Sequence, residues 1–382
     1  MQRFGRTLVA TVLAAAAVLG TGAATAAAGQ VAVTGPPPGT AAWRADTVLG
    51  VALPDPATAT PAEVAAFLAG LTPAGREALA VRHPLVVGNL DGAPVELRYR
   101  ANALALAEER SAELAAAGDE RLGGSARAAA RARAERYASL AGRQILAFDP
   151  RGRGQVAEVF GDLTLAPRTA VVVPGSDIDL MSFDRAGDPG GTPAGMARAL
   201  RAATGEQVAV VAWTGYTTPV GLGLDAVTED LAVAGGRRLA RFLTGLAAQR
   251  GAATVFCHSY GSVVCARAGL GPDQALGVVV LGSPGMGTGR AADLRVPVWA
   301  AERNAADWIG DVPHVSVLGL GHGTDPTDPA FGARVLSSAG SHGHTGYFAP
   351  GTASLANFAA LAAGDPAAVT CTGAGQECRD AI

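Results

Sequence analysis

Short apolar runs alternate with amphipathic helical stretches along the chain from residue 144 onward. The apolar runs, rich in Val and Ala, occupy residues 144–148, 155–160, 169–173, 207–213, 253–256, 275–281, 296–300 and 314–318. Helical periodicity is found over residues 192–203, 228–248, 260–270 and 352–363. Alternating strands and helices are typical of a mostly parallel sheet with helices on both faces. The pattern therefore predicts an α/β domain over residues 144–366.

A helical pattern precedes this domain. Four apolar residues share one helix face: Val64, Phe67, Leu68 and Leu71. Later stretches up to Arg143 keep the helical period, so we expect a helical N-terminal region over residues 61–143. The Pro- and Ala-rich residues 29–60 predict an extended leader, and residues 367–382 a C-terminal tail.

The first residues have the layout of a secretory signal peptide. Arg3 and Arg6 precede an apolar stretch over residues 8–19, and small residues follow up to Ala28. The apolar stretch is shorter than the ~20 residues that span a bilayer. We therefore expect residues 1–28 to be cleaved, leaving a secreted protein without a transmembrane span in the mature chain.

The net charge and the missing motifs argue against nucleic acid, metal ions and nucleotide cofactors as ligands. The net charge is −3 at pH 7, and without a basic cluster a nucleic-acid partner is not expected. The His and Cys residues lack zinc-ligand spacing, and neither a phosphate-binding loop nor a dinucleotide fingerprint is present. We expect no metal and no cofactor.

Ser259 is the strongest candidate for chemistry. The apolar residues 252–256 lead into Cys257-His258-Ser259-Tyr260-Gly261, and helical residues follow. A serine on a sharp strand-to-helix turn is exposed to a substrate carbonyl, as in the G-x-S-x-G nucleophile elbow. Cys257 replaces the first glycine of that motif, a position where a small side chain is needed. The segment therefore predicts a serine nucleophile.

A serine nucleophile needs a histidine base and an acid that orients it. In serine hydrolases built on such a sheet, the chain order is Ser, acid, His. Among the late histidines we favour His344, which leads into the last helix; His342 is the competitor, and His322 is expected to shape the pocket.

The acid is expected after the strand at residues 296–300. Asp307 is preferred because Trp308 and Ile309 indicate a packed setting, whereas Asp311 lies near a proline and could belong to a turn. Glu302, nearer the strand, stays open as an alternative. The expected oxyanion donors are the backbone N–H groups of Tyr260, after the nucleophile, and of Ser176, in the turn after residues 170–173.

Four cysteines in an exported chain favour disulfides. Cys371 and Cys378 enclose a short loop and are expected to pair locally. Cys257 and Cys265 would then be partners beneath the elbow, provided that their Cα atoms approach within about 7 Å. The alternative, which the sequence favours equally, is that both residues remain free thiols, buried where the strand packs on the helix.

Several short motifs in one order carry a family resemblance. They are His83-Pro84-Leu85-Val86-Val87-Gly88-Asn89-Leu90-Asp91-Gly92, Val172-Val173-Pro174-Gly175, Trp213-Thr214-Gly215-Tyr216, His258-Ser259-Tyr260-Gly261-Ser262, Leu281-Gly282-Ser283-Pro284-Gly285, His322-Gly323 and His344-Thr345-Gly346-Tyr347. From near Pro61 to Gly364 the chain resembles an actinobacterial family of secreted α/β-hydrolases of unknown function. The resemblance implies an α/β-hydrolase fold with a helical N-terminal extension, and Ser259, Asp307 and His344 as a triad. It implies no substrate.

Three functions are compatible with these residues. The leading hypothesis is a secreted serine hydrolase with esterase-like acyl hydrolysis of a small-molecule or lipid-like substrate. An extracellular acyltransferase would use the same triad with another acceptor in place of water. A non-catalytic binding module would keep the fold alone, because fold does not establish function.

Overall fold

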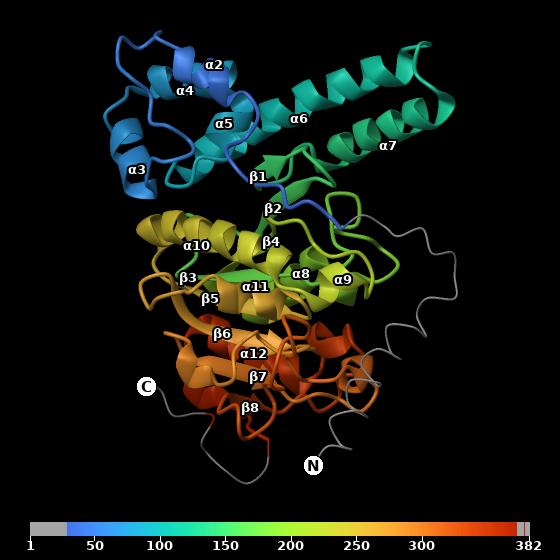
Figure 1. Ribbon diagram of the computed structural model, residues 1–382. Helices are drawn as coiled ribbons and strands as arrows, with labels where there is room; N and C mark the ends of the chain where they lie inside the picture. Colours follow the sequence, from blue (N-terminus) through green and yellow to red (C-terminus); the bar gives the residue numbers. More distant parts are fainter. Residues whose placement is uncertain (1–28, 373–377, 379–382) are drawn as a thin grey trace. The chain divides into compact units, whose positions relative to one another are not determined.

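An eight-stranded sheet forms the centre of the structure, a computed structural model that describes residues 29–372 and Cys378 (Figure 1). The strand order is β1-β2-β4-β3-β5-β6-β7-β8. The strands are β1 Ile145–Asp149, β2 Gln155–Phe160, β3 Arg168–Val173, β4 Val208–Thr214, β5 Ala253–His258, β6 Ala275–Leu281, β7 Val298–Ala301 and β8 Arg334–Leu336. Among the described strands, the pairs β1–β2 and β2–β4 are antiparallel and the other five pairs are parallel, so the mostly parallel sheet is confirmed.

Helices cover both faces of the sheet because the central strands are apolar on both sides. Val171 of β3 joins a core cluster with α10 (Asp230–Arg250) and α11 (Gly261–Arg267). Its neighbour Val172 joins the opposite cluster with α8 (Pro193–Thr204) and α12 (Ala353–Ala363). Successive strand residues point to opposite faces, so this run of valines fills two cores at once.

The strand predicted over residues 314–318 is wrong. Val317 and Leu320 instead close a tight turn by exchanging backbone hydrogen bonds of 2.9 and 3.0 Å. Two glycines, Gly319 and Gly321, have positive φ angles there, which a strand does not accommodate. The place beside β7 is taken by β8, whose three residues are too few to show a period in the sequence.

The N-terminal helices pack on the antiparallel edge of the sheet (Figure 1). They are α2 Thr40–Ala45, α3 Pro61–Ala69, α4 Pro73–Arg82, α5 Pro84–Gly88, α6 Val95–Gly118 and α7 Gly124–Leu140. Two asparagines reach the β1 backbone: Asn102 donates to Ile145 O at 3.0 Å and Asn89 to Phe148 O at 2.7 Å. These bonds satisfy groups at the outer edge of β1, which would otherwise be open to pairing with another chain.

The leader that we expected to be extended contains α2 (Thr40–Ala45). Trp43 of this helix is fully buried against Val64 and Leu68, and its indole donates to Pro54 O at 2.8 Å. Trp43, with its polar edge satisfied, therefore helps to tie this Pro-rich segment to the helical region, together with Asp46, which binds Arg82 and His83.

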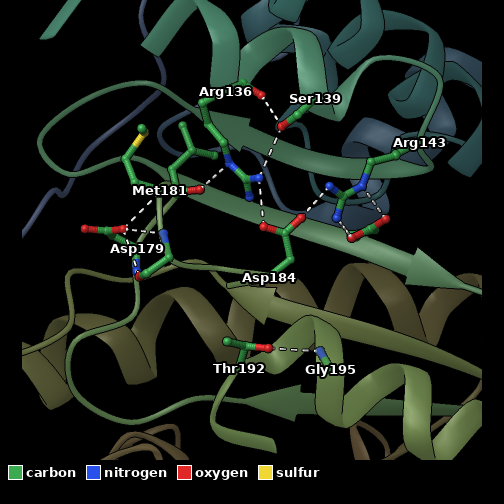
Figure 2. Close-up of polar contacts among 11 residues, drawn as sticks. Arg136, Ser139, Arg143, Asp179, Met181, Asp184, Thr192 and Gly195 are labelled. Atoms are coloured by element: carbon green, nitrogen blue, oxygen red, sulfur yellow. Dashed lines mark hydrogen bonds and ion pairs between the residues drawn. The ribbon is translucent and has the colours of Figure 1, made fainter. Parts of the chain in front are cut away.

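Ion pairs fasten the loop after β3 to helix α7 (Figure 2). Arg136 binds Asp184 at 2.8 Å and donates to Leu180 O at 2.6 Å, and Arg143 reaches the other oxygen of Asp184 at 2.6 Å. Arg143 also pairs with Glu158 of β2. Because this loop contains Ser176, the helical region braces one of the segments that were expected to bind an oxyanion.

Both cysteine pairs are bridged, with Cα–Cα distances of 6.5 Å for Cys257–Cys265 and 5.6 Å for Cys371–Cys378. The disulfide alternative at the elbow is therefore confirmed over the two free thiols. The signal peptide predicted over residues 1–28 lies outside the described residues. Among residues 29–372, no helix combines the length and hydrophobicity that a membrane span requires.

Candidate active site

Ser259 lies on a strained turn between β5 and α11. Its φ angle is +54°, in the left-handed region that non-glycine residues seldom adopt, and its N–H donates to Leu281 O at 3.0 Å. Helix α11 starts two residues later at Gly261, where a Cβ would come within 2.6 Å of Val173 O. The local geometry is that of a nucleophile elbow, and Ser259 is 9% exposed at its apex.

Gly175 lets the turn after β3 approach the serine. A Cβ on Gly175 would lie 2.5 Å from Ser259 Cβ and 3.0 Å from its Oγ, so no larger residue fits without displacement. Tyr216 holds the turn by donating to Pro174 O at 2.7 Å. The two turns predicted from the sequence therefore meet in space.

Asp307 and His344 form a direct pair. His344 Nδ1 lies 2.7 Å from Asp307 Oδ1, which also accepts the Ile309 N–H at 3.0 Å. Tyr347 donates to the second carboxylate oxygen at 2.6 Å. Because a carboxylate only accepts hydrogen bonds, Nδ1 carries the proton and Nε2 of the neutral ring is left as the acceptor.

The setting of Asp307 keeps it ionised. Burial by itself raises the pKa of this carboxyl, but the hydrogen bonds from His344, Tyr347 and the Ile309 N–H outweigh burial and hold the pKa below its ordinary value. The same contact with the carboxylate, together with burial, raises the pKa of Tyr347, so its hydroxyl stays a donor. A fixed negative charge therefore faces the imidazole.

The His344 ring lies beside the end of β6, next to the nucleophile. A Cβ on Gly282 would come within 2.9 Å of His344 Cε1, and Gly282 follows the Leu281 carbonyl that binds the Ser259 N–H. In the described part of the chain, the Ser259 hydroxyl and the His344 ring share no hydrogen bond. Such bonds are often long in free enzymes and tighten when substrate binds.

Two residues that sequence reasoning did not select hold the His344 segment. His258 Nε2 donates to His344 O at 2.9 Å, and the two rings lie 4.7 Å apart. Burial and the nearby His344 lower the pKa of His258 to about 3, so this ring stays neutral. Asn304 exchanges two hydrogen bonds of 2.9 Å with the backbone of Gly343.

The base of the elbow is a buried hydroxyl network, also missed from the sequence. Ser262, fully buried, donates to Ser259 O at 2.7 Å and lies 2.6 Å from Ser283 Oγ. Ser283 in turn accepts the Gly285 N–H at 3.1 Å. A Ser three residues after the nucleophile, paired with the Gly-Ser-Pro turn after β6, is the signal that could have indicated it.

The two expected oxyanion donors belong to the two turns that meet at Ser259. Tyr260 is the first residue after Ser259 and precedes α11, and Ser176 follows Gly175. Within residues 29–372, neither backbone N–H is paired with a protein acceptor. The Tyr260 side chain points elsewhere, since its hydroxyl donates to Thr228 O at 2.8 Å.

The alternative acids and bases do not join this cluster. Asp311 and His342 are exposed, and Glu302 makes no side-chain contact with the described histidines. His322 is buried behind Tyr260, where its Nε2 donates to Ala226 O at 2.8 Å. Among the described residues, no group of three or more His, Cys, Asp or Glu side chains is placed to hold a metal ion.

Comparisons with known proteins agree with the fold. A family model described as alpha/beta hydrolase matches residues 149–317, which include Ser259 and Asp307. Two relatives, uncharacterized proteins MT2140 and Rv2079 of Mycobacterium tuberculosis strains CDC 1551 and H37Rv, are each 29% identical over 82% of this chain. The chain spans 57% of the length of these relatives.

Two solved structures are also similar. The esterase domain of a Rhodothermus marinus protein is 16% identical, with a TM-score of 0.30 over 56% of this chain and 93% of that one. The apo form of Thermogutta terrifontis esterase 2 is 10% identical, with a TM-score of 0.31 over 55% and 87%. The family match over residues 149–317 and the mostly parallel sheet together support an α/β-hydrolase fold.

Proposed function

We propose that this protein is a serine hydrolase that cleaves carboxylic esters through Ser259, His344 and Asp307. The observation that carries the proposal is the Asp307–His344 pair beside a serine held at a positive φ angle on an elbow. Each residue type has the environment that its role requires: a hydroxyl at the apex of the elbow, an imidazole whose Nδ1 is bonded to a carboxylate, and a carboxylate kept ionised.

In the proposed reaction, Ser259 Oγ attacks the acyl carbonyl while His344 Nε2 takes the hydroxyl proton. The carbonyl oxygen becomes an oxyanion that accepts hydrogen bonds from the Tyr260 and Ser176 N–H groups. The C–O bond to the alcohol then breaks, and His344 returns the proton to the leaving oxygen. Water repeats the sequence on the acyl-enzyme, which releases the acid and restores Ser259.

The fixed carboxylate of Asp307 supplies two effects in this scheme. It keeps the proton on His344 Nδ1, so that Nε2 is the basic atom, and it stabilises the imidazolium that forms when Ser259 is deprotonated. His258 and Asn304 act through His344: they hold the backbone on either side of its ring. We class both as positioning residues.

We also propose that the enzyme acts outside the cytoplasm. The signal-peptide pattern of residues 1–28 motivates this, and two disulfides support it, because such bonds persist in oxidising compartments. Expression of the full chain, with N-terminal sequencing of the protein recovered from the medium, tests it. A product that is retained in the cell with an intact N-terminus would count against export.

Labelling with a fluorophosphonate probe tests the chemistry. The wild-type protein should be labelled covalently, Ser259→Ala should not, and His344→Ala should lose most of the labelling rate. His342→Ala is the matched control, since it removes an exposed histidine from the same loop and should label like wild type. Folded wild-type protein that resists labelling and hydrolyses no ester would overturn the proposal.

A further inference from the structure

Large aliphatic side chains are exposed on two loops at the carboxyl edge of the sheet. One loop follows β4 and includes α9 (Leu224–Val227); the other follows β7. Their exposed residues are Val220, Leu222, Leu224, Val317, Leu318 and Leu320. We call this set the apolar rim.

The two loops are in direct contact with one another. The Gly321 N–H donates to Val227 O at 2.8 Å, and His322 Nε2 donates to Ala226 O at 2.8 Å. The hairpin that carries Leu318 therefore lies against α9, and the rim is one surface rather than scattered side chains. Contiguous exposed apolar surface of this kind marks an interaction site.

Leu318 is the most pronounced member of the rim. It lies at the apex of the Val317–Leu320 turn, its φ angle is +55°, and its side chain is 98% exposed. A bulky residue in this backbone region is strained, and an exposed one packs against nothing in its own chain. Leu224, at 74% exposure, projects from the neighbouring helix.

The rim adjoins the proposed catalytic residues. Both loops leave the same edge of the parallel sheet as the elbow, and Tyr260, beside Ser259, is bonded through its hydroxyl to Thr228 O just after α9. Trp308, 41% exposed in the β7 loop, lies 4.5 Å from the His344 ring. An exposed aromatic side chain therefore lies beside His344, on the same loop that carries the Leu318 turn.

The composition of the rim indicates what covers it. Residues 214–224 and 312–323 contain no Asp, Glu, Lys or Arg, and the first charged residue after the former stretch is Asp225 of α9. Aliphatic Val and Leu are under-represented among the residues that dominate protein–protein binding, where Trp, Tyr and Arg prevail. Leu and Val do, however, favour transfer into hydrocarbon, and the lack of basic residues gives no attraction to anionic lipid.

We propose that the apolar rim inserts into the surface of aggregated neutral lipid and thereby presents Ser259 to insoluble acyl esters. This inference rests on the proposed function, because it names the physical state of the substrate for that same site. It predicts that the enzyme prefers an ester in an aggregate over the same ester dissolved in water.

Vesicle flotation tests the insertion without any turnover. Full-length Ser259→Ala should float with zwitterionic phosphatidylcholine vesicles. Adding Leu224→Ser and Leu318→Ser should weaken the partition coefficient by about tenfold per leucine, because each loses the transfer free energy of one buried side chain. The matched control is Leu165→Ser, which removes a leucine that is 78% exposed at the opposite edge of the sheet, before β3.

Hydrolysis of a short-chain triacylglycerol, assayed below and above its solubility limit, tests the consequence. The wild-type rate should rise sharply once aggregates form, and the ratio of the two rates should fall in the double leucine variant but not in Leu165→Ser. Circular dichroism and the melting temperature establish that each variant is folded.

The outcomes separate the two proposals. Absence of fluorophosphonate labelling counts against the serine hydrolase, whatever the vesicles show. If the wild-type protein is labelled but Ser259→Ala does not float with the vesicles, or floats equally well with both leucines replaced, the proposal that the apolar rim inserts into lipid is overturned. Sedimentation that reveals a dimer dissociated by the leucine substitutions would also overturn it, because the rim would then bind a second copy of the chain.

Discussion

Replacing Asp307 by asparagine tests whether the negative charge beside His344 accelerates the proposed reaction. The substitution keeps the shape of the side chain, and its amide can still meet His344 and the Tyr347 hydroxyl, but the negative charge 2.7 Å from His344 Nδ1 is lost. At an effective dielectric constant of about 20, unit charges ~3 Å apart interact by about 5–6 kcal/mol. That energy corresponds to about 10⁴ in rate if it is expressed only when the imidazolium forms.

The assay is steady-state hydrolysis of a soluble nitrophenyl ester, together with the second-order rate of fluorophosphonate inactivation. We expect kcat to fall by about 10³–10⁴ with little change in KM, because the lost interaction belongs to the transition state. Asp311→Asn is the matched control, since it neutralises an exposed carboxylate on the same loop and should stay within about twofold of wild type.

Two results would refute this reasoning. If Asp307→Asn keeps more than about a tenth of the wild-type kcat, the carboxylate does not stabilise a developing imidazolium. If Asp311→Asn is instead the impaired variant, the acid has been assigned to the wrong residue. Unchanged melting temperatures in both variants would show that the rates report chemistry rather than folding.

Other contacts in the site give further predictions. His258 has a pKa of about 3, against about 6.5 unfolded, so the stability gained from its neutral form is complete above pH 6.5 and is lost as pH falls toward 3. His258→Gln should therefore show a shallower fall in melting temperature between pH 7 and 4, and an equal fall would contradict the buried neutral ring. Replacing Cys257 and Cys265 by alanine should lower the free energy of unfolding, measured by denaturant titration, by about 2–3 kcal/mol, which is the loop-closure value for so short a bridge. As an internal control, the double alanine variant and the wild type under reducing conditions should have the same free energy of unfolding. Gly175→Ala should abolish labelling of Ser259, since the new methyl would lie 2.5 Å from its Cβ, and normal labelling would mean that the turn after β3 moves freely.

The local pattern of the chain was sufficient to predict the α/β fold and the strand–turn–helix segment that carries Ser259. Strand residues such as Val171–Val173 are buried on both faces of the sheet, and such strands are recognised in the sequence as runs of consecutive apolar residues. Ser259 was found because its strand, turn and helix are contiguous. The pairing of Cys257 with Cys265 stayed open in the sequence, since only the Cα separation of 6.5 Å across the turn permits the bridge.

Contacts between distant segments could not be read from the residues alone. Preferring Asp307 over Asp311 was an inference from neighbouring side chains, whereas the bond to His344 joins positions 37 apart. His258 and Asn304 carry no local signature, because both form their hydrogen bonds with the backbone of a loop far along the chain. β8 was missed because three residues show no period, and the turn at Leu318 was mistaken for a strand because its apolar residues resemble one.

Strand and helix formation depend on side chains a few residues apart, so the sequence specified the α/β layers and the turn that presents Ser259. The approach of His344 to Asp307, the glycine contacts around the serine and the meeting of α9 with the Leu318 hairpin depend on how the strands order themselves in the sheet. Packing of the whole chain brings those groups together, because no interaction between neighbours in sequence encodes their distances.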